Sequence, residues 1–349
     1  MSTFRILSVS LVFLALVCLA PPTALGADVY VSAVCGSDIT GNGTLQAPYA
    51  SIETGLSKAF PGDTMRVLPS SVLAASCPPL SPYVLTTVDK NVQIIAEAGP
   101  GLTLCKGFVI ADDKTVTIRG FTVANDEGNG ITVGSATTGK VTIENCVISH
   151  CRDSGIYKNY GAAVAAPPVS LAITNCVIVG CGACGVTITV ARPNLTNYIP
   201  AVTIDNSIIA VNTSYAIGFT AVLDRGGPVT IRYSQTCGNL GGATPQIQNA
   251  TSTLIDIQNP LVCPLPGLLL TQFQDANLCD FRLQANGTLR ETGNPACMYR
   301  NPDGSRNDPG AFGGPGCIGY YPFCGPVIEC VDIQQTQVPT TIRVRIKVR

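Results

Sequence analysis

Residues 116–123 read VTIRGFTV, and the opening of this segment returns four more times along the chain. The later copies are VTIENCVI at 141–148, LAITNCVI at 171–178, VTIDNSII at 202–209 and VTIRYS at 229–234, with starts 25, 30, 31 and 27 residues apart. Fourteen residues after each of the first four starts, a small residue precedes an aliphatic one: Gly130-Ile131, Gly155-Ile156, Gly185-Val186 and Ala216-Ile217. Agreement at several offsets indicates a solenoid, whose repeats bury their apolar faces by stacking on one another.

The alternation inside each copy predicts a short β-strand. Val116 and Ile118 should face the interior, while Thr117 and Arg119 face outward. No amphipathic helical pattern of 10–15 residues separates the copies, which argues against leucine-rich and βαβ architectures. The sequence therefore predicts an all-β parallel β-helix with one coil per 25–31 residues.

Two further expectations follow from the coil register, because adjacent coils lie about 4.8 Å apart. Three asparagines share one position and should stack as a side-chain ladder at a turn: Asn145, Asn175 and Asn206. Opposite charges fall on adjacent coils at Arg119/Glu144 and Asp205/Arg232. These should approach as exposed ion pairs, each worth at most about 1 kcal/mol.

Composition narrows the function classes. Of 349 residues, 46% are hydrophobic and only 12% are charged, which excludes a disordered acidic or basic chain. The net charge of −1 gives no basic field for a nucleic-acid backbone, and a single histidine leaves little room for a His-rich metal site.

The N-terminus has the pattern of a secretory signal peptide. Arg5 precedes an apolar run at 6–20, then Pro21, Pro22 and the small-residue stretch at 24–26. The run is short for a membrane span, and an uncleaved anchor is the alternative. We expect a signal at 1–26, a β-helix domain at 27–325 and a strand-like tail at 326–349, in a secreted or cell-surface protein without a membrane span.

Export would place the cysteines in an oxidising compartment. Sixteen are present, and Cys18 would leave with the signal. Cys146 and Cys176 share one coil position, as do Cys151 and Cys181, so each pair could form a disulfide between neighbouring coils. The alternative is that these residues pack as small apolar side chains.

Several segments together resemble the secreted right-handed parallel β-helix proteins of the pectate-lyase-like superfamily. They are VYVS at 29–32, AFPGDT at 59–64, NPL at 259–261, CDFRL at 279–283, GNPA at 293–296 and DPGAFG at 308–313. The resemblance covers roughly residues 28–325. The resemblance implies a right-handed β-helix whose last coils and cap lie near residues 259–313. It also implies a function that involves polysaccharide.

The chain departs from the catalytic patterns of that superfamily. It has no G-H-G motif, and Asp112-Asp113 stands in ADDK, where a turn between strands is favoured over a catalytic pair. An oxygen-rich loop with Asp303, Asn307 and Asp308 could hold calcium, although a turn-rich cap is the favoured interpretation.

One polar cluster is a candidate site, because stacking would bring charged turns of two coils to one edge. Its candidate acids, bases or charge neutralisers are His150, Arg152 and Lys158; its candidate substrate or cation ligands are Asp126, Glu127, Asp153, Tyr157 and Tyr160. Such a set could position an acidic sugar, bind calcium, or abstract a proton beside a carboxylate. The alternative, which the sequence favours, is that charged turns keep the solenoid soluble.

The final segment alternates β-branched and basic residues from Ile342 to Arg349. It predicts an exposed strand whose charges block edge-to-edge pairing, or the start of a truncated β-sandwich module.

Two functions are compatible with these features. The first is a secreted or surface-attached β-helix that binds a polysaccharide or cell-surface glycan, as a monomer and without required cofactor. The second is a polysaccharide lyase, or a related enzyme, that acts on an acidic polysaccharide with calcium as a possible cofactor.

Overall fold

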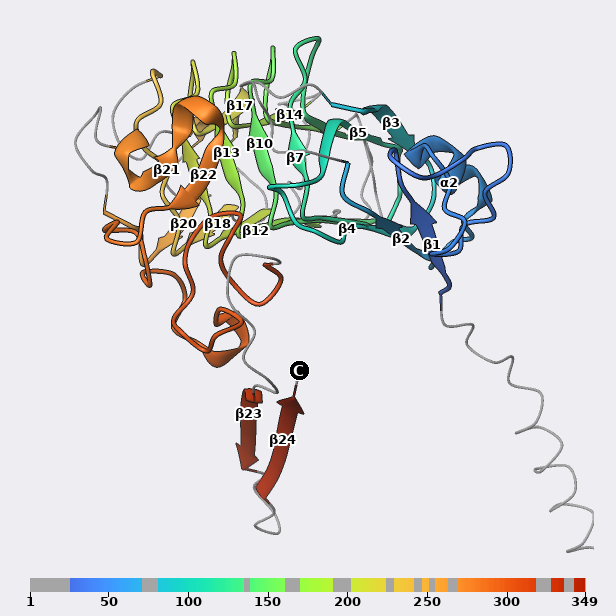
Figure 1. Ribbon diagram of the computed structural model, residues 1–349. Helices are drawn as coiled ribbons and strands as arrows, with labels where there is room; N and C mark the ends of the chain where they lie inside the picture. The colour runs from blue at the N-terminus through green and yellow to red at the C-terminus, as the bar shows by residue number, and fades with distance from the viewer. Residues whose placement is uncertain are drawn as a thin grey trace, which may run out of the picture.

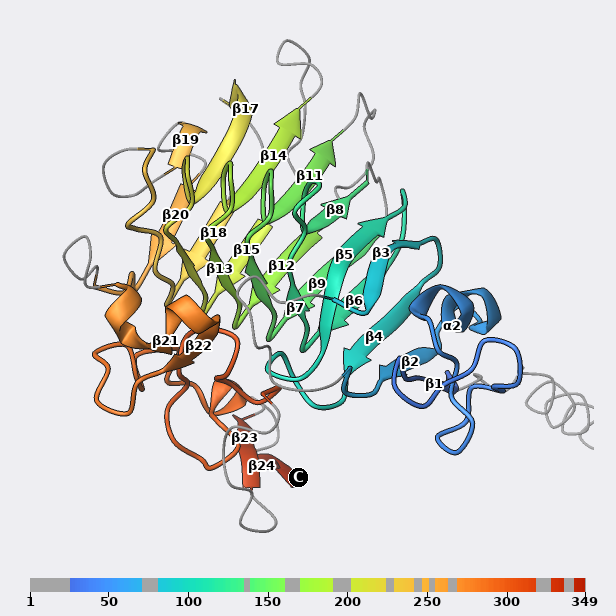
Figure 2. The ribbon, with the colours of Figure 1, turned by 45° about the horizontal axis from the view of Figure 1, so that its top comes forward.

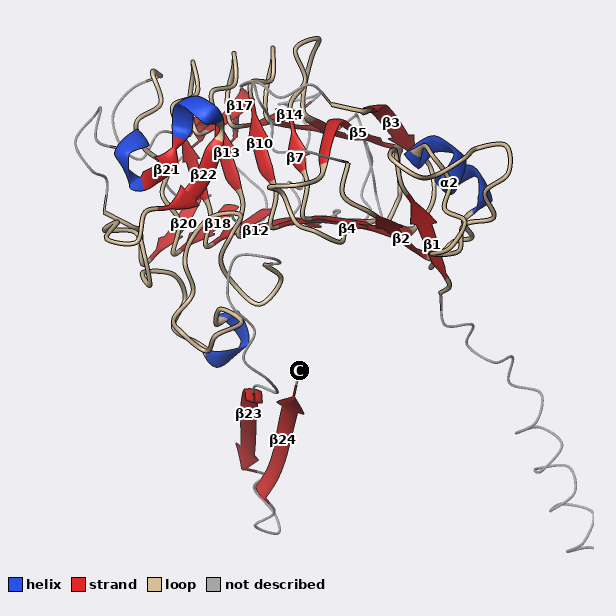
Figure 3. Ribbon diagram, viewed as in Figure 1, coloured by secondary structure: helices blue, strands red, loops and turns tan. Residues whose placement is uncertain are grey.

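The computed structural model describes residues 26–70, 81–134, 139–160, 170–190, 202–223, 229–241, 247–250, 255–262, 269–317, 328–335 and 342–348. The expected signal peptide, apart from Gly26, lies outside these residues. The described chain is a stack of coils built almost entirely from parallel strands, with short helices only outside the stack (Figure 3).

The coils that begin at residues 116, 140, 170 and 202 present strands on three sides (Figures 1 and 2). The first row is a nine-stranded sheet made of β1 (Asp28–Val31), β2 (Thr64–Val67), β4 (Val92–Ala96), β6 (Val116–Arg119), β9 (Lys140–Glu144), β12 (Ser170–Thr174), β15 (Val202–Asp205), β18 (Val229–Arg232) and β20 (Ile255–Gln258). We call its outward surface the first face.

The other two rows belong to one eleven-stranded sheet that is continuous through β5. The second row consists of β7 (Thr122–Val123), β10 (Val147–Ser149), β13 (Val177–Val179) and β16 (Ile208–Ala210). The third row consists of β3 (Tyr83–Val88), β5 (Leu104–Ile110), β8 (Ile131–Val133), β11 (Ile156–Tyr160), β14 (Val186–Val190), β17 (Ile217–Leu223) and β19 (Ile247–Ala250). Their outward surfaces are the second and third faces.

The predicted coil register is confirmed. Val116, Val141, Leu171, Val202 and Val229 pair in succession across the first row. Their side chains are at most 1% exposed, and they belong to one apolar interior that runs through the stack. Each such aliphatic side chain contributes roughly 1.5–3 kcal/mol by leaving water.

The three asparagines of the predicted ladder lie at one turn of adjacent coils, as expected. Asn145, Asn175 and Asn206 have φ values of 50°, 49° and 50°, a left-handed conformation that asparagine tolerates better than most residues. All three side chains are buried. The sequence did not predict their partners, which are a segment far away along the chain.

Residues 269–317 form this segment, and they correct the expectation of terminal coils and a cap. The two short strands β21 (Phe273–Asp275) and β22 (Asp280–Leu283) pair antiparallel with each other and lie beside the second row (Figure 2). We call residues 269–317 the flanking segment. It covers the second face rather than continuing the stack.

Two kinds of contact hold the flanking segment in place. A second apolar cluster joins outward residues of the second row to the segment, and its members include Val177, Ile208, Phe273, Phe281 and Leu289. The asparagine turn supplies hydrogen bonds at the same time. The Asn145 amide donates to the carbonyls of Ala311 and Gly313, at 3.1 and 2.7 Å. The Asn175 amide donates to Asp308 O at 3.0 Å, and Asn206 Oδ1 accepts from Asn294 N at 2.7 Å.

The two ends of the described chain differ. The helix α2 (Ile52–Lys58) lies beside β1 to β3, and the Ser51 hydroxyl caps its first turn at 3.1 Å from Thr54 N. At the other end, β23 (Ile328–Gln335) and β24 (Ile342–Val348) pair antiparallel as a separate two-stranded sheet.

None of the helices among the described residues has the length and hydropathy needed to cross a membrane.

Candidate functional site

The charged turns that precede the third row do lie along one edge of the solenoid, but their charges are already paired. Asp126 and Glu127 are about three-quarters exposed, and their carboxylates lie 3.5 and 3.0 Å from Lys106 Nζ on β5. The Glu127 carboxylate, with Asp126 in support, raises the pKa of Lys106. The repeat pattern does not reveal Lys106, because this residue stands in a coil that precedes the recognised copies.

One coil further on, Arg152 and Asp153 form their own pair. The guanidinium lies 3.3 Å from the Asp153 carboxylate, and the Asp153 amide donates to Gly128 O at 3.2 Å. The backbone contact stacks this turn on the Asp126–Glu127 turn. The structure thus brings four of the predicted site residues to one edge, together with Lys106.

His150 points elsewhere. It adopts φ 53°, and its Nδ1 lies 3.9 Å from the sulfur of Cys279 in the flanking segment. Burial lowers the pKa of the imidazole. His150 therefore faces the covered side of the molecule and does not join the charged edge.

Lys158 points into the core, which corrects its predicted place at the edge. On β11 it pairs with Val133 on one side and Ile188 on the other, and its side chain is fully buried. The ammonium donates to the carbonyl of Gly134. Burial lowers the pKa of Lys158 to about 8, although the carboxylates of Asp112 and Asp113 oppose this shift. Counting by twos from the inward Ile156 would have predicted this placement.

Tyr157 is the neighbour of Lys158 and takes the opposite, outward direction. It is partly exposed on the third face, between Thr132 and Thr187 in the register. Tyr160 pairs with Val190 at the end of the same strand, and its side chain lies outside the described residues. Asp112 and Asp113 form the predicted turn, in which Asp113 has φ 57°.

The cysteine positions are confirmed and the bridges are not. Cys146 and Cys176 are fully buried in adjacent coils, as are Cys151 and Cys181 at no more than 2% exposure. All four are thiols in the structure. A hydrogen bond from the Cys181 thiol to Cys151 lowers the pKa of Cys151 and raises the pKa of Cys181. Disulfides occur elsewhere, at Cys237, Cys279 and Cys297.

A second, inward ladder shares the position of Cys151 and Cys181. In the next two coils this position holds Asn212 and then Asn239, whose side chains are 2.8 Å apart and buried. Asn212 Oδ1 also accepts from Cys181 N at 3.0 Å. Equal offsets from each repeat start would have revealed it.

The carboxylates expected as calcium ligands contact protein groups in the structure. No three His, Cys, Asp or Glu side chains among them lie close enough together to hold a metal ion. The edge carboxylates are paired with Lys106 and Arg152. In the loop at 303–308, Asp303 accepts from Ser305 N at 2.9 Å and Asp308 lies 3.3 Å from Arg290, so these groups shape the loop.

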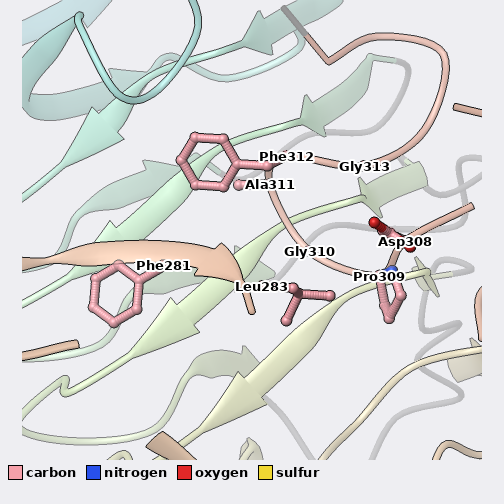
Figure 4. A pocket seen from close by; sticks show the side chains of 8 residues that line it. All are labelled: Phe281, Leu283, Asp308, Pro309, Gly310, Ala311, Phe312 and Gly313. Atoms are coloured by element: carbon pink, nitrogen blue, oxygen red, sulfur yellow. The ribbon is translucent and has the colours of Figure 1, made fainter. Parts of the chain in front are cut away.

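A small hollow lies between β22 and residues 308–313, lined by Phe281, Leu283 and the side of Phe312 (Figure 4). It has room for about one water molecule. It is a packing gap within the flanking segment and is too small for a sugar.

Comparison with known proteins agrees with this architecture. The family model described as "Right handed beta helix region" matches residues 106–221. This part of the chain is a right-handed β-helix. The resemblance drawn from the sequence is therefore confirmed at the level of the fold.

Among solved structures, the chain aligns with one titled "Crystal structure of pectate lyase Pel9A". The TM-score is 0.32 and the identity 15%, over 83% of this chain and 97% of that chain. No curated protein matches the chain.

Proposed function

We propose that this β-helix protein acts outside the cell by binding polysaccharide, without catalysing its cleavage. The β-helix places long rows of side chains on flat outer faces, which suits a polymer better than a small molecule. The hollow within the flanking segment holds only about one water, so it offers no site for a small ligand.

The observation that carries the proposal is that the candidate acids and bases do not converge. Lys158 is fully buried, whereas His150 contacts Cys279 under the flanking segment. The edge acids Asp126 and Glu127 are held by Lys106. A general base must reach the proton that it removes, and proton transfer of this kind needs groups within hydrogen-bond distance of one substrate.

A lyase is the second candidate, and one observation favours it. The pKa of Lys158 lies at about 8, in the range of a general base at neutral pH. The lyase would require the third row to open at Gly134, since Lys158 donates to that carbonyl inside the core.

A glycan panel tests both candidates. The full chain is run through gels that each contain one polysaccharide. Each polysaccharide is also incubated with the protein, with and without calcium, and assayed for unsaturated products. We expect retardation by at least one polysaccharide and no product. If the chain binds none of the polysaccharides in the panel, the proposal is contradicted.

Product formation would favour the lyase instead. In that case Lys158→Met should abolish turnover, while Lys140→Met at the exposed start of β9 serves as the matched control. Product formation by Lys158→Met at the wild-type rate would remove the lysine from the mechanism.

A further inference from the structure

The third face carries a row of uncharged residues across seven strands, interrupted at the buried Gly218. In register these are Thr87, Val109, Thr132, Tyr157, Thr187, Gly218 and Gln248. Six strand spacings of about 4.8 Å make the row roughly 29 Å long. Beside it, Asn159, Thr189 and Thr220 lie on β11, β14 and β17 and are exposed or partly exposed. Among the described residues, neither set includes a charged side chain.

The other two faces have different chemistry. The second face is aliphatic, and the flanking segment covers it. The first face carries charges, such as Arg66 between Asp28 and Glu97 at 2.8 and 2.7 Å, and Arg232 beside Asp205 at 2.7 Å. Aliphatic side chains suit a face that another protein segment buries, and paired charges suit a face that water solvates. Hydroxyl, amide and tyrosine side chains match a neutral ligand rich in hydroxyl groups.

Hydrogen bonds orient two hydroxyls of the third face. Thr187 Oγ1 lies 2.6 Å from Ser154 Oγ, and Thr189 Oγ1 donates to Lys158 O at 3.1 Å. A hydroxyl that donates its proton within the protein presents its lone pairs outward as acceptors. Holding these groups in place reduces the entropy lost when a ligand binds.

Tyr157 stands near the middle of the row. Its ring offers a broad apolar surface with few rotatable bonds, and its hydroxyl can bind a polar group at the rim. Its neighbours in the row, Thr132 and Thr187, are shorter, so the ring has space on both sides along the solenoid axis.

The charged edge next to the third face does not favour an acidic polymer. Its carboxylates at Asp126, Glu127 and Asp153 outnumber the cations Lys106 and Arg152, and each carboxylate has a cationic partner. An anionic chain along this edge would meet a small excess of negative charge.

We propose that the third face binds a neutral polysaccharide, which lies along the solenoid axis and stacks a sugar ring on Tyr157. This inference rests on the proposed binding function and narrows it to the neutral class. It also places the contact on the uncharged row and not at the charged edge.

Affinity electrophoresis of the full chain tests the class of ligand. Neutral xyloglucan, mixed-linkage β-glucan and galactomannan are compared with polygalacturonate at low and high salt. We expect retardation by at least one neutral polymer, unchanged by salt, and none by polygalacturonate. Binding of polygalacturonate alone would overturn the neutral class and leave the proposed function standing. Binding of neither class would defeat both.

Matched variants test the location. Tyr157→Ala and Thr132→Val change the third face, whereas Tyr30→Ala and Thr142→Val change outward residues of β1 and β9 on the first face. We expect Tyr157→Ala to weaken binding by about tenfold or more, and the first-face pair to leave it unchanged. Equal losses for Tyr157→Ala and Tyr30→Ala, with unfolding curves matching the wild type, would overturn the assignment.

Discussion

The second and third faces are two sides of the same coils, yet they meet different surroundings. Val177 on β13 is outward and fully buried, because Phe273 and other side chains of the flanking segment cover that face. Thr187 follows ten residues later in the same coil, is also outward, and remains partly exposed. The repeat dictates which residues point out of the coil. The chemistry of each outward position then decides what lies against it.

A charge placed on each face should give the largest contrast. Val177→Asp puts a carboxylate into the apolar contact with the flanking segment, where it would lack a partner, and should cost more than about 3 kcal/mol. Thr187→Asp on the third face keeps its carboxylate in water and should cost roughly 0.5 kcal/mol or less. Urea unfolding of both variants gives the comparison. Similar midpoints for the two would mean that the second face is not covered.

Lys158 sharpens the comparison beneath the third face. Its pKa is about 8 in the folded protein against 10.5 for an ordinary lysine, so the unfolded chain binds more protons between these values. The stability of the wild type should therefore rise as the pH passes from 8 to 10.5. At pH 7 the full cost of burying the charged Lys158 ammonium applies. Replacing Lys158 with an uncharged residue should therefore raise the free energy of unfolding by up to about 3 kcal/mol.

Lys158→Met tests this, since methionine has a similar length and no charge. Thermal unfolding at pH 7 should show a more stable variant, with the advantage shrinking above pH 8. A variant less stable than the wild type at pH 7 would indicate that the Gly134 contact outweighs the desolvation of the ammonium.

The asparagine ladder should contribute a middle-sized effect. Asn175→Gly keeps the left-handed backbone at φ 49° accessible while removing the amide that binds Asp308 O and Asn307 Oδ1. We expect a loss of about 2 kcal/mol and faster proteolysis within residues 269–317. Asn175→Ala should lose more, because alanine is strained at this φ. Equal losses for both would mean that the backbone conformation contributes little.

The sequence predicted the coils because their signal is local and repeated. Val, Thr and Ile alternate within each strand, and the spacing brings equal offsets together without knowledge of distant contacts. The flanking segment depends on contacts more than 100 residues apart, such as Asn175 with Asp308, and no periodicity encodes them. A partial signal did exist. Val147, Val177 and Ile208 share an outward offset, and aliphatic residues repeated at an outward position indicate a covered face.

The candidate site was harder to predict, since charged residues pair with whatever lies nearest. Asp126 was correctly placed on an edge, but its partner Lys106 belongs to β5, which precedes the copies recognised by the repeat. Lys158 was expected at the charged edge because it follows Tyr157 in the sequence. The strict alternation of β11 instead points the two side chains in opposite directions, and Lys158 is buried.

The smallest effect concerns the first face. Asp205 and Arg232 form the predicted pair, with two contacts of 2.7 Å, but the carboxylate is almost buried instead of exposed as expected. Arg119 and Glu144 pair in register but are not among the ion pairs found within the described residues. Arg232→Met should cost about 1 kcal/mol and Arg119→Met less. Urea midpoints compare them, and a larger loss at Arg119 would reverse our assignment.

Nitration of tyrosines by tetranitromethane, read by peptide mass spectrometry, tests most directly whether the third face is the binding surface. The full chain is treated alone and with the neutral polysaccharide that retards it most. We predict that the polysaccharide protects Tyr157 and leaves the reactivity of Tyr30 unchanged. Equal nitration of Tyr157 with and without a saturating polysaccharide would contradict the account.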